Sequence, residues 1–154
     1  MEVTDTPMMI ARPTYRQPRL LALVVLGGAV GTTARWSLGQ AFATAPGHWP
    51  SVTFAINLIG SFLLGLLLET LVRSGPDAGW RRAVRVGIGT GILGGFTTYS
   101  TFVVEVDRLM ATGHAWTGGA YAVLSILIGV LAAVAGIGLA RTLPPVRLRS
   151  RTTP

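Results

Sequence analysis

Four long apolar segments constrain the fold of this chain more than any other feature of its sequence. Each is long enough to cross the hydrocarbon core of a bilayer, which takes about 20 residues of helix. Only 12% of the 154 residues are charged, about half the share of a typical soluble domain. We therefore predict an all-α integral membrane protein with four transmembrane helices, over residues 20–44, 50–72, 84–106 and 116–140.

The connections between these segments are short, so the helices are expected to form one domain over residues 20–143. Residues 1–19 and 144–154 are rich in Pro, Thr and Arg and are predicted to be flexible tails. A cleaved signal peptide is the alternative interpretation of the first segment, because arginines precede its apolar run. Arg35 interrupts the sequence between that run and a small-residue site, which favours a retained helix.

The positive charge of the chain is distributed in a way that predicts membrane topology. All 13 basic residues are arginines, most of them outside the apolar segments, a pattern more typical of a topology signal than of nucleic-acid binding. With four spans, both tails and the loop between the second and third segments lie on one side of the membrane. That side carries most of the arginines, whereas the other side carries Arg35 and Arg108. The eleven arginines of the first side are Arg12, Arg16, Arg19, Arg73, Arg81, Arg82, Arg85, Arg141, Arg147, Arg149 and Arg151. Both termini are therefore predicted to be cytoplasmic.

Polar residues inside a predicted span are costly and usually have a function. Asn57 lies on one face of the second segment with Thr53, Gly60 and Ser61, at helical spacing. A contact between helices, cross-linked by the amide, would explain this face. We favour a functional role for Asn57, because a side-chain amide offers two donors to an anion.

The third segment is rich in glycine. Residues 89–94 match G-x-G-x-x-G, but the nucleotide fingerprint requires a preceding strand, which a transmembrane segment does not supply. The glycines permit tight packing, and the weak helix formers from Gly94 to Thr97 predict a break at mid-membrane. Such breaks line cavities or bind ions. A kinked helix packed through glycine is the simpler alternative.

Beyond this break, aromatic and hydroxyl side chains share helix faces. Tyr99 and Phe102 are three residues apart, with Ser100 and Thr101 beside them. Ring edges carry positive charge density and can face an anion, although aromatic residues at this spacing are more often part of a core. In the fourth segment Tyr121 and Ser125 form a pair four residues apart, and both a packing hydrogen bond and a pore lining are compatible with that spacing.

These motifs resemble one family, the small bacterial fluoride channels known as Fluc or CrcB. The resemblance covers residues 24–140 and rests on three strings: Gly27-Gly28-Ala-Val-Gly31-Thr-Thr-Ala-Arg35-Trp36, Thr53-Phe-Ala-Ile-Asn57-Leu-Ile-Gly60-Ser61 and Gly94-Gly95-Phe96-Thr97-Thr98-Tyr99-Ser100-Thr101-Phe102 with Glu105. It implies a fluoride-specific channel that exports fluoride from the cytoplasm by passive electrodiffusion and so lowers its toxicity. It also implies the bacterial inner (plasma) membrane as location and an antiparallel dimer with two pores and a central structural Na⁺.

The resemblance also implies roles for individual residues. Backbone carbonyls of Gly94 and Thr97 would hold the sodium ion, Arg35 would line a vestibule, and Glu105 would be structural, paired with or orienting hydroxyls. The expected pore and fluoride-binding residues are Asn57, Tyr99, Ser100, Thr101, Phe102, Tyr121 and Ser125. Tyr99 departs from the phenylalanine commonest at its position. Fluoride is small and strongly hydrated, so a selective pore has to replace its water with many donors.

The arginine bias conflicts with a simple antiparallel homodimer, which needs copies inserted in both directions. We therefore predict either a heterodimer with an oppositely biased paralogue or dual insertion despite the arginines. A small multidrug or cation exporter is the alternative function, but it needs an acid in its first helix, where this chain has Arg35. A non-transporting assembly subunit would not explain the polar track. An enzyme is not expected, because no catalytic set or phosphate loop has a credible setting.

Overall fold

The computed structural model describes residues 16–146, and all regular structure in this range is helical. The predictions for Arg12, Arg147, Arg149 and Arg151, and for most of the two tails, lie outside the described residues. The helical elements are α1 (Pro18–Ala41), α2 (Ser51–Ser74), α3 (Gly79–Val84), the π-helix η2 (Arg85–Leu93), α4 (Gly94–Phe96), α5 (Ser100–Ala111) and α6 (Ala115–Thr142).

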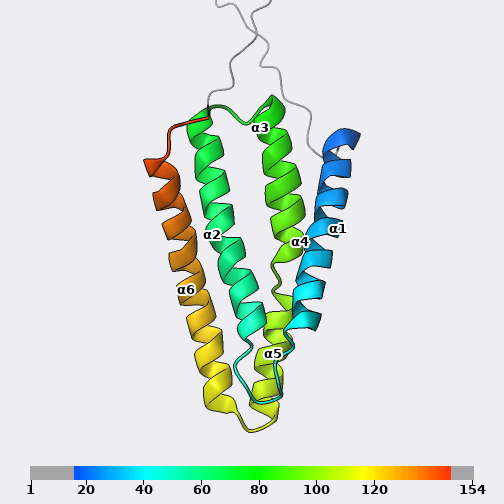
Figure 1. The fold of residues 1–154 in the computed structure, drawn as a ribbon, viewed down its shortest axis with the longest axis vertical. Coiled ribbons are helices and arrows are strands. Elements are labelled where there is room, and N and C mark those ends of the chain that lie inside the picture. The colour runs from blue at the N-terminus through cyan, green and yellow to red at the C-terminus, as the bar shows by residue number, and fades with distance from the viewer. Residues whose placement is uncertain (1–15, 147–154) are drawn as a thin grey trace, which may run out of the picture.

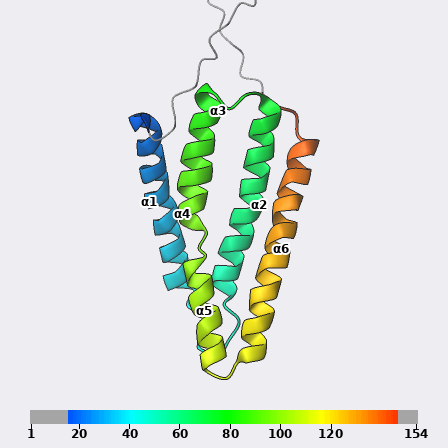
Figure 2. The same ribbon diagram turned by 180° about the vertical axis from the view of Figure 1, so that it is seen from behind.

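The helices run side by side along one elongated bundle (Figure 1). The start of α1, the α2–α3 loop and the end of α6 lie at one end, and the α1–α2 and α5–α6 loops lie at the other (Figure 2). α1 packs on η2 and α4, whereas α2 packs on α6, and α5 also contacts α6. The bundle therefore contains two tight helix pairs, α1 with η2 and α2 with α6.

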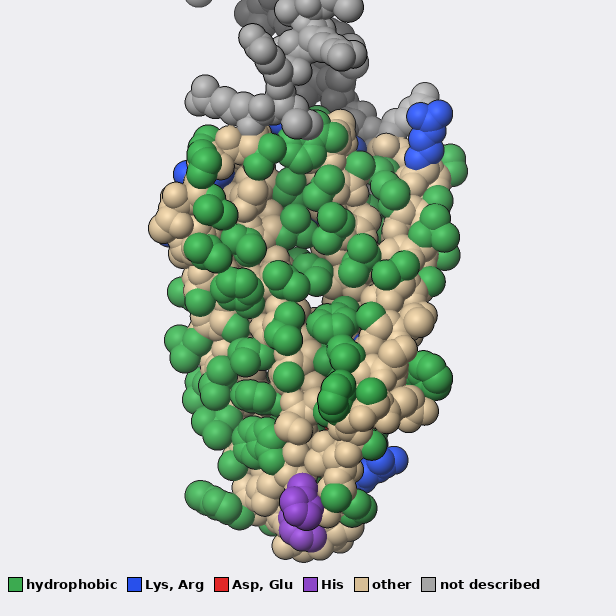
Figure 3. Space-filling model, viewed as in Figure 1, with side chains coloured by type: hydrophobic (Ala, Val, Ile, Leu, Met, Phe, Trp, Pro, Cys, Tyr) green, Lys and Arg blue, Asp and Glu red, His purple; other side chains and the backbone are tan. Residues whose placement is uncertain are grey.

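Three of these helices, α1, α2 and α6, are long and apolar enough to cross a membrane. Large apolar side chains cover the outside of the bundle (Figure 3), including Val25, Leu26 and Val72. A soluble monomer rarely exposes so large an apolar surface. The prediction of an all-helical integral membrane protein is confirmed, and the predicted spans 20–44, 50–72 and 116–140 match these helices to within three residues at each end.

The third predicted span, 84–106, is broken as predicted, but the break extends further along the chain than Thr97. Helical structure runs without interruption from Gly79 to Phe96 and resumes at Ser100, so the break comprises residues 97–99 rather than Gly94 to Thr97. The glycines of residues 87–91 form part of the wide η2 turn instead of ending the helix. At Thr97 the backbone becomes extended, with ψ 158°.

Glycines bring the helix backbones into close contact, as the sequence predicted. A Cβ atom on Gly27 of α1 would lie 2.5 Å from the carbonyl oxygen of Gly87 in η2, and one on Gly95 would lie 2.5 Å from that of Gly28. On the other pair, a Cβ on Gly136 of α6 would collide with the carbonyl oxygen of Phe62 in α2. Small residues at such contacts are typical of helix association in membranes.

Arginines organise the end of the bundle that holds the α2–α3 loop. The Arg85 guanidinium donates to both carboxylate oxygens of Asp77, at 3.0 and 2.8 Å. This hydrogen bond lowers the pKa of Asp77 below its ordinary value. Arg73 donates to the carbonyl oxygens of Ala140 and Leu143, which lie at the C-terminal end of α6 where a positive charge also complements the helix dipole.

We expect Gly136→Ala to destabilise the protein, because the added methyl group collides with the α2 backbone. Overpacking of this kind costs about 1–3 kcal/mol. Gly138→Ala, two residues along the same helix, is the matched control, because nothing lies within 4 Å of a Cβ there. Thermal unfolding of the purified protein in detergent measures both, and equal midpoints for the two variants would contradict the close α2–α6 contact.

Candidate functional site

A groove of about 430 Å³ opens beside the break, between α2, the α4–α5 junction and α6. We call it the break groove. Four of the predicted pore residues come together there, and so do both predicted sodium ligands: Asn57, Tyr99, Phe102, Ser125, Gly94 and Thr97. Residues more than 60 positions apart in the sequence thus line one hollow.

Asn57 holds the backbone at the break. Its side-chain Nδ2 donates to the carbonyl oxygen of Thr98 at 2.9 Å, and its Oδ1 accepts from the Thr98 backbone N–H at 2.8 Å. The amide thus occupies the place of a peptide group and satisfies both backbone groups of the residue at the centre of the break. The second hydrogen of Nδ2 remains available to another acceptor.

The hydroxyl of Thr98 organises the start of α5. It accepts from the Thr101 backbone N–H at 3.2 Å and donates to the Thr101 hydroxyl at 3.0 Å, and the Ser100 hydroxyl lies 3.3 Å away. The predicted residues Ser100 and Thr101 therefore belong to a cluster centred on Thr98, which the sequence interpretation did not select. Thr98 could have been selected from the sequence, because a threonine just before the start of a helix often hydrogen-bonds to the first backbone groups of that helix.

Aromatic rings follow one another from the break into the bundle. The Tyr99 and Phe102 centroids are 6.1 Å apart, and the Phe102 and Tyr121 centroids are 5.2 Å apart. Tyr99 is 79% exposed, whereas Tyr121 is fully buried. Tyr99 thus lies at the outer edge of the break groove, and Phe102 lies between it and the interior.

Glu105 joins three helices through its two carboxylate oxygens. Oε1 accepts from the Thr53 hydroxyl of α2 at 2.7 Å, and Oε2 accepts from the Tyr121 hydroxyl of α6 at 2.8 Å. Tyr121, predicted to line the pore, thus donates its hydroxyl to Glu105 rather than lining the break groove. Thr53 was visible in the sequence only as a neighbour of Asn57 on the same helical face.

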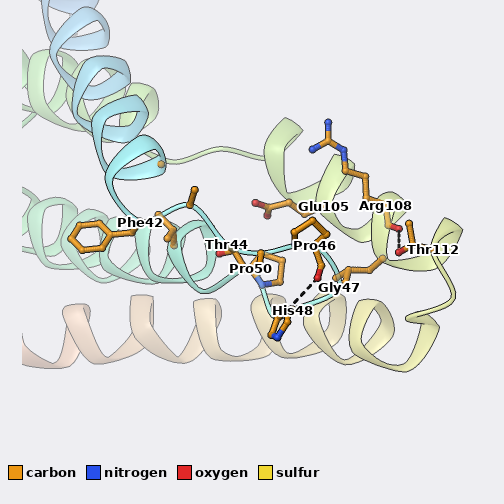
Figure 4. A pocket seen from close by; sticks show the side chains of 14 residues that line it. Phe42, Thr44, Pro46, Gly47, His48, Pro50, Glu105, Arg108 and Thr112 are labelled. Carbon is orange, nitrogen blue, oxygen red and sulfur yellow. Dashed lines mark hydrogen bonds between the residues drawn. The ribbon is translucent and has the colours of Figure 1, made fainter.

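A second hollow, of about 380 Å³, lies on the other side of Glu105, under the α1–α2 loop (Figure 4). We call it the loop cavity. Glu105 and Arg108 line it from α5, and Pro46 and His48 line it from the loop. Phe102, one turn before Glu105, lines the break groove, so successive turns of α5 lead from one hollow to the other.

Arg35, predicted to line a vestibule, lies in α1 beside the last turn before the break. Its Nε donates to the carbonyl oxygen of Gly95 at 3.2 Å, and the Thr32 hydroxyl approaches the same oxygen at 3.4 Å. Gly95 is in the last turn before the break, where helix carbonyls lose their usual partners. The C-terminal end of a helix carries partial negative charge, so the positive guanidinium of Arg35 is favourable there.

Two kinds of polar atom in the break groove have no hydrogen-bond partner within the described residues. The Ser125 Oγ is buried in this way. The carbonyl oxygens of Gly94 and Thr97 also accept no hydrogen bond from residues 16–146. Ser125 therefore has a buried hydroxyl that can still donate, and Gly94 and Thr97 have carbonyl oxygens that can still accept or bind a cation. No group of three His, Asp or Glu residues that could hold a metal ion occurs in the described chain.

Residues 22–137 match the family described as "CrcB-like protein, Camphor Resistance (CrcB)". The chain belongs to the CrcB family. The matched range contains every residue that lines the break groove, and also Glu105 and its two hydrogen-bond partners.

Curated relatives carry consistent names. The chain is 48% identical over 127 residues to "Fluoride-specific ion channel FluC 2" of Leifsonia xyli subsp. xyli, with 82% of this chain and 87% of that protein covered. It is 48% identical over 118 residues to "Fluoride-specific ion channel FluC 1" of Cutibacterium acnes, covering 77% and 82%. It is 45% identical over 115 residues to "Fluoride-specific ion channel FluC" of Deinococcus radiodurans, covering 73% and 88%.

We expect Asn57→Ala in this CrcB-family chain to loosen the break, because both backbone groups of Thr98 lose their partners. Thr98 is half-buried, and about 1–3 kcal/mol, the cost of orphaning a fully buried group, is the upper range for this change. Hydrogen exchange followed by mass spectrometry should show faster exchange in peptides that span residues 97–101. Ser61→Ala, one turn along α2 and in the same groove, is the control and should leave exchange unchanged. Unchanged exchange in Asn57→Ala would contradict the role of Asn57 at the break.

Proposed function

We propose that this chain is a subunit of a fluoride-specific ion channel that exports fluoride by passive electrodiffusion and so lowers its toxicity. Family membership and the names of the relatives support this function. The observation that carries it in the molecule itself is the break groove, which Asn57, Phe102 and Ser125 line together and where the buried hydroxyl of Ser125 has no partner within the described residues.

The chemistry of this lining suits fluoride. A pore for a small, strongly hydrated anion has to replace water with donors and remain narrow. Asn57 retains one amide hydrogen, Ser125 retains its hydroxyl hydrogen, and the ring edges of Tyr99 and Phe102 add weak positive charge density. Neutral donors of this kind release the ion more readily than a fixed cation in the groove would.

The alternative, a small multidrug or cation exporter, lacks support from the charged residues. Such a transporter needs a titratable acid in its first helix to bind a cation, and the charged residues of α1 are Arg19 and Arg35. Channels move ions without covalent chemistry, and we assign no catalytic activity to this chain.

We propose that the α3–α5 segment, with its break, is the fourth transmembrane span and that two subunits pair antiparallel. The exposure of Tyr99 at the edge of the break groove supports pairing, because a second subunit would cover that ring and narrow the path. The partner is either a second copy or a paralogue of opposite charge bias. Several relatives carry numbered names, such as FluC 1 and FluC 2.

We propose a structural sodium ion at the break as well. The carbonyl oxygens of Gly94 and Thr97 would hold it, with the same pair from the second subunit. Both oxygens lack donors within residues 16–146, and hard oxygen ligands suit a hard cation. Gly94 is the first residue of α4 and Thr97 directly follows its last residue, so the two carbonyls belong to the two ends of this short helix. The ion would neutralise the C-terminal end of that helix.

We place both termini in the cytoplasm of a bacterium whose inner membrane holds the protein. Among described residues, seven arginines belong to the end of the bundle where α1 starts and α6 ends: Arg16, Arg19, Arg73, Arg81, Arg82, Arg85 and Arg141. Arg35 and Arg108 belong to the other half of the bundle. Arginines near span ends are retained on the cytoplasmic side.

Phe102→Ile is expected to lower fluoride flux by about tenfold, which corresponds to a barrier about 1.4 kcal/mol higher. Isoleucine fills similar space but has no ring edge to face the ion. Fluoride efflux from liposomes with purified protein measures the effect, and Val134→Ile on the exposed side of α6 is the control. Wild-type flux in a Phe102→Ile protein that elutes as the native assembly would remove Phe102 from the path.

Topology reporters fused after residue 154 test the charge assignment. With termini fixed by the arginines, a phosphatase reporter, active only in the periplasm, should stay silent, and a cytoplasmic fluorescent reporter should be bright. This result would require a partner of opposite orientation. Activity of both reporters would contradict fixed insertion and favour a dual-topology homodimer.

A further inference from the structure

A third hollow, of about 380 Å³, runs along the bundle between α1 and the α3–η2 segment. We call it the α1–η2 groove. Every residue of its lining is apolar, and its walls are formed by Leu23, Leu26, Val30, Val84, Ile88 and Ile92. Leu26 is 66% exposed and Val30 is 58% exposed, so the apolar wall of α1 faces outward with no cover from the described chain.

The groove exists because two backbones meet at its floor. Gly27 and Gly87 both lie in the lining, and a Cβ on Gly27 would be only 2.5 Å from the carbonyl oxygen of Gly87. The apolar side chains on either side of this glycine contact form the walls of the groove. Because its volume is about 380 Å³, the groove can take one hydrocarbon chain but not a helix with a diameter of about 10 Å.

The α1–η2 groove and the break groove open on neighbouring sides of η2. Ile88 and Ile92 line the α1–η2 groove, whereas Gly89 and Leu93, the residues that follow them, line the break groove. Successive residues of a helix point in directions about a quarter of a turn apart, so the two hollows do not share a wall of side chains. The subunit proposed to cover Tyr99 therefore does not need to cover the α1–η2 groove.

One end of the groove leads to positive charge. Arg19 precedes Leu23 by four residues in α1, and Trp80 precedes Val84 by four residues in α3, so each continues a wall of the groove by one turn. Arg19 is exposed and has no ion pair within the described chain. The Arg81 guanidinium lies 5.6 Å from the centroid of the Trp80 ring.

The surrounding charge is unbalanced. Seven described arginines belong to this end of the bundle, against two acids, Glu69 and Asp77. Both acids are already paired: Glu69 with Arg141, and Asp77 with Arg82 and Arg85. Neither acid therefore neutralises Arg19, the arginine that continues the α1 wall of the groove.

We propose that the α1–η2 groove binds an anionic phospholipid, with one acyl chain along its apolar walls and the phosphate beside Arg19 and Trp80. An acyl chain in the groove makes van der Waals contacts with its walls that an unfilled groove would lack. A guanidinium matches phosphate geometry with two parallel hydrogen bonds, and tryptophan favours the headgroup level. A zwitterionic phospholipid would fill the groove equally well and bring the same phosphate, but its own cationic group would offset the attraction to Arg19.

The absence of cysteine from the chain allows a site-specific test. Ile88→Cys, labelled with a fluorophore, reports from within the groove when the full-length protein is placed in phosphatidylcholine bilayers. Brominated-chain phosphatidylglycerol or brominated-chain phosphatidylcholine is added at equal mole fraction. We expect phosphatidylglycerol to associate about fivefold more strongly, as one arginine beside an anionic headgroup implies. Val30→Cys repeats the measurement from the opposite wall, in case the first variant does not fold.

Two arginine variants locate the charge. Arg19→Gln should abolish the preference for phosphatidylglycerol, whereas Arg141→Gln, at the same end but paired with Glu69 on α6, should keep it. A label at Val134→Cys, on exposed α6, should be quenched equally by both lipids. Equal quenching of the groove label by the two lipids would overturn the proposal. Loss of the preference for phosphatidylglycerol to the same extent in Arg19→Gln and Arg141→Gln would also overturn it. Protection of both groove labels from both lipids would show that a second copy covers the groove and would also overturn it.

Discussion

The pair of hydrogen bonds between the side chain of Asn57 and the backbone of Thr98 is the constraint on which the rest of the site depends. A helix that breaks inside a membrane frees N–H and C=O groups, and each group left unpaired in hydrocarbon costs several kcal/mol. Asn57 pairs with both groups of one residue. The chain can then turn between α4 and α5, and Tyr99 lies at the outer edge of the break groove with Phe102 further in.

Glycine packing and polar contacts divide the work of holding the bundle together. Glycines set the distance within each helix pair, α1 with η2 and α2 with α6. Polar contacts connect these pairs in addition to the ring contact of Phe102 with Tyr121: Asn57 joins α2 to the break, and Glu105 joins α5 to α2 and α6. The residues that connect the two halves thus also line or adjoin the two hollows, so assembly of the bundle and assembly of the site are one process.

The sequence predicts the elements of this molecule better than their contacts. Segment length and apolarity were enough for α1, α2 and α6, because spanning a bilayer constrains length directly. Weak helix formers from Gly94 to Thr97 predicted a break, and the break begins at the last of them, Thr97. Its centre is Thr98, whose backbone pairs with Asn57, 41 residues away, a contact that local sequence cannot show. Helical spacing likewise placed Tyr121 on a face with Ser125, but could not show that Glu105, on another helix, accepts its hydroxyl hydrogen.

The central claim is that the neutral donors of the break groove select fluoride over larger anions. The most direct test compares fluoride and chloride efflux from liposomes that contain the purified wild-type protein, at equal gradients and with a potassium ionophore to balance charge. The account predicts rapid fluoride efflux with chloride retained. Chloride efflux as fast as that of fluoride would contradict it.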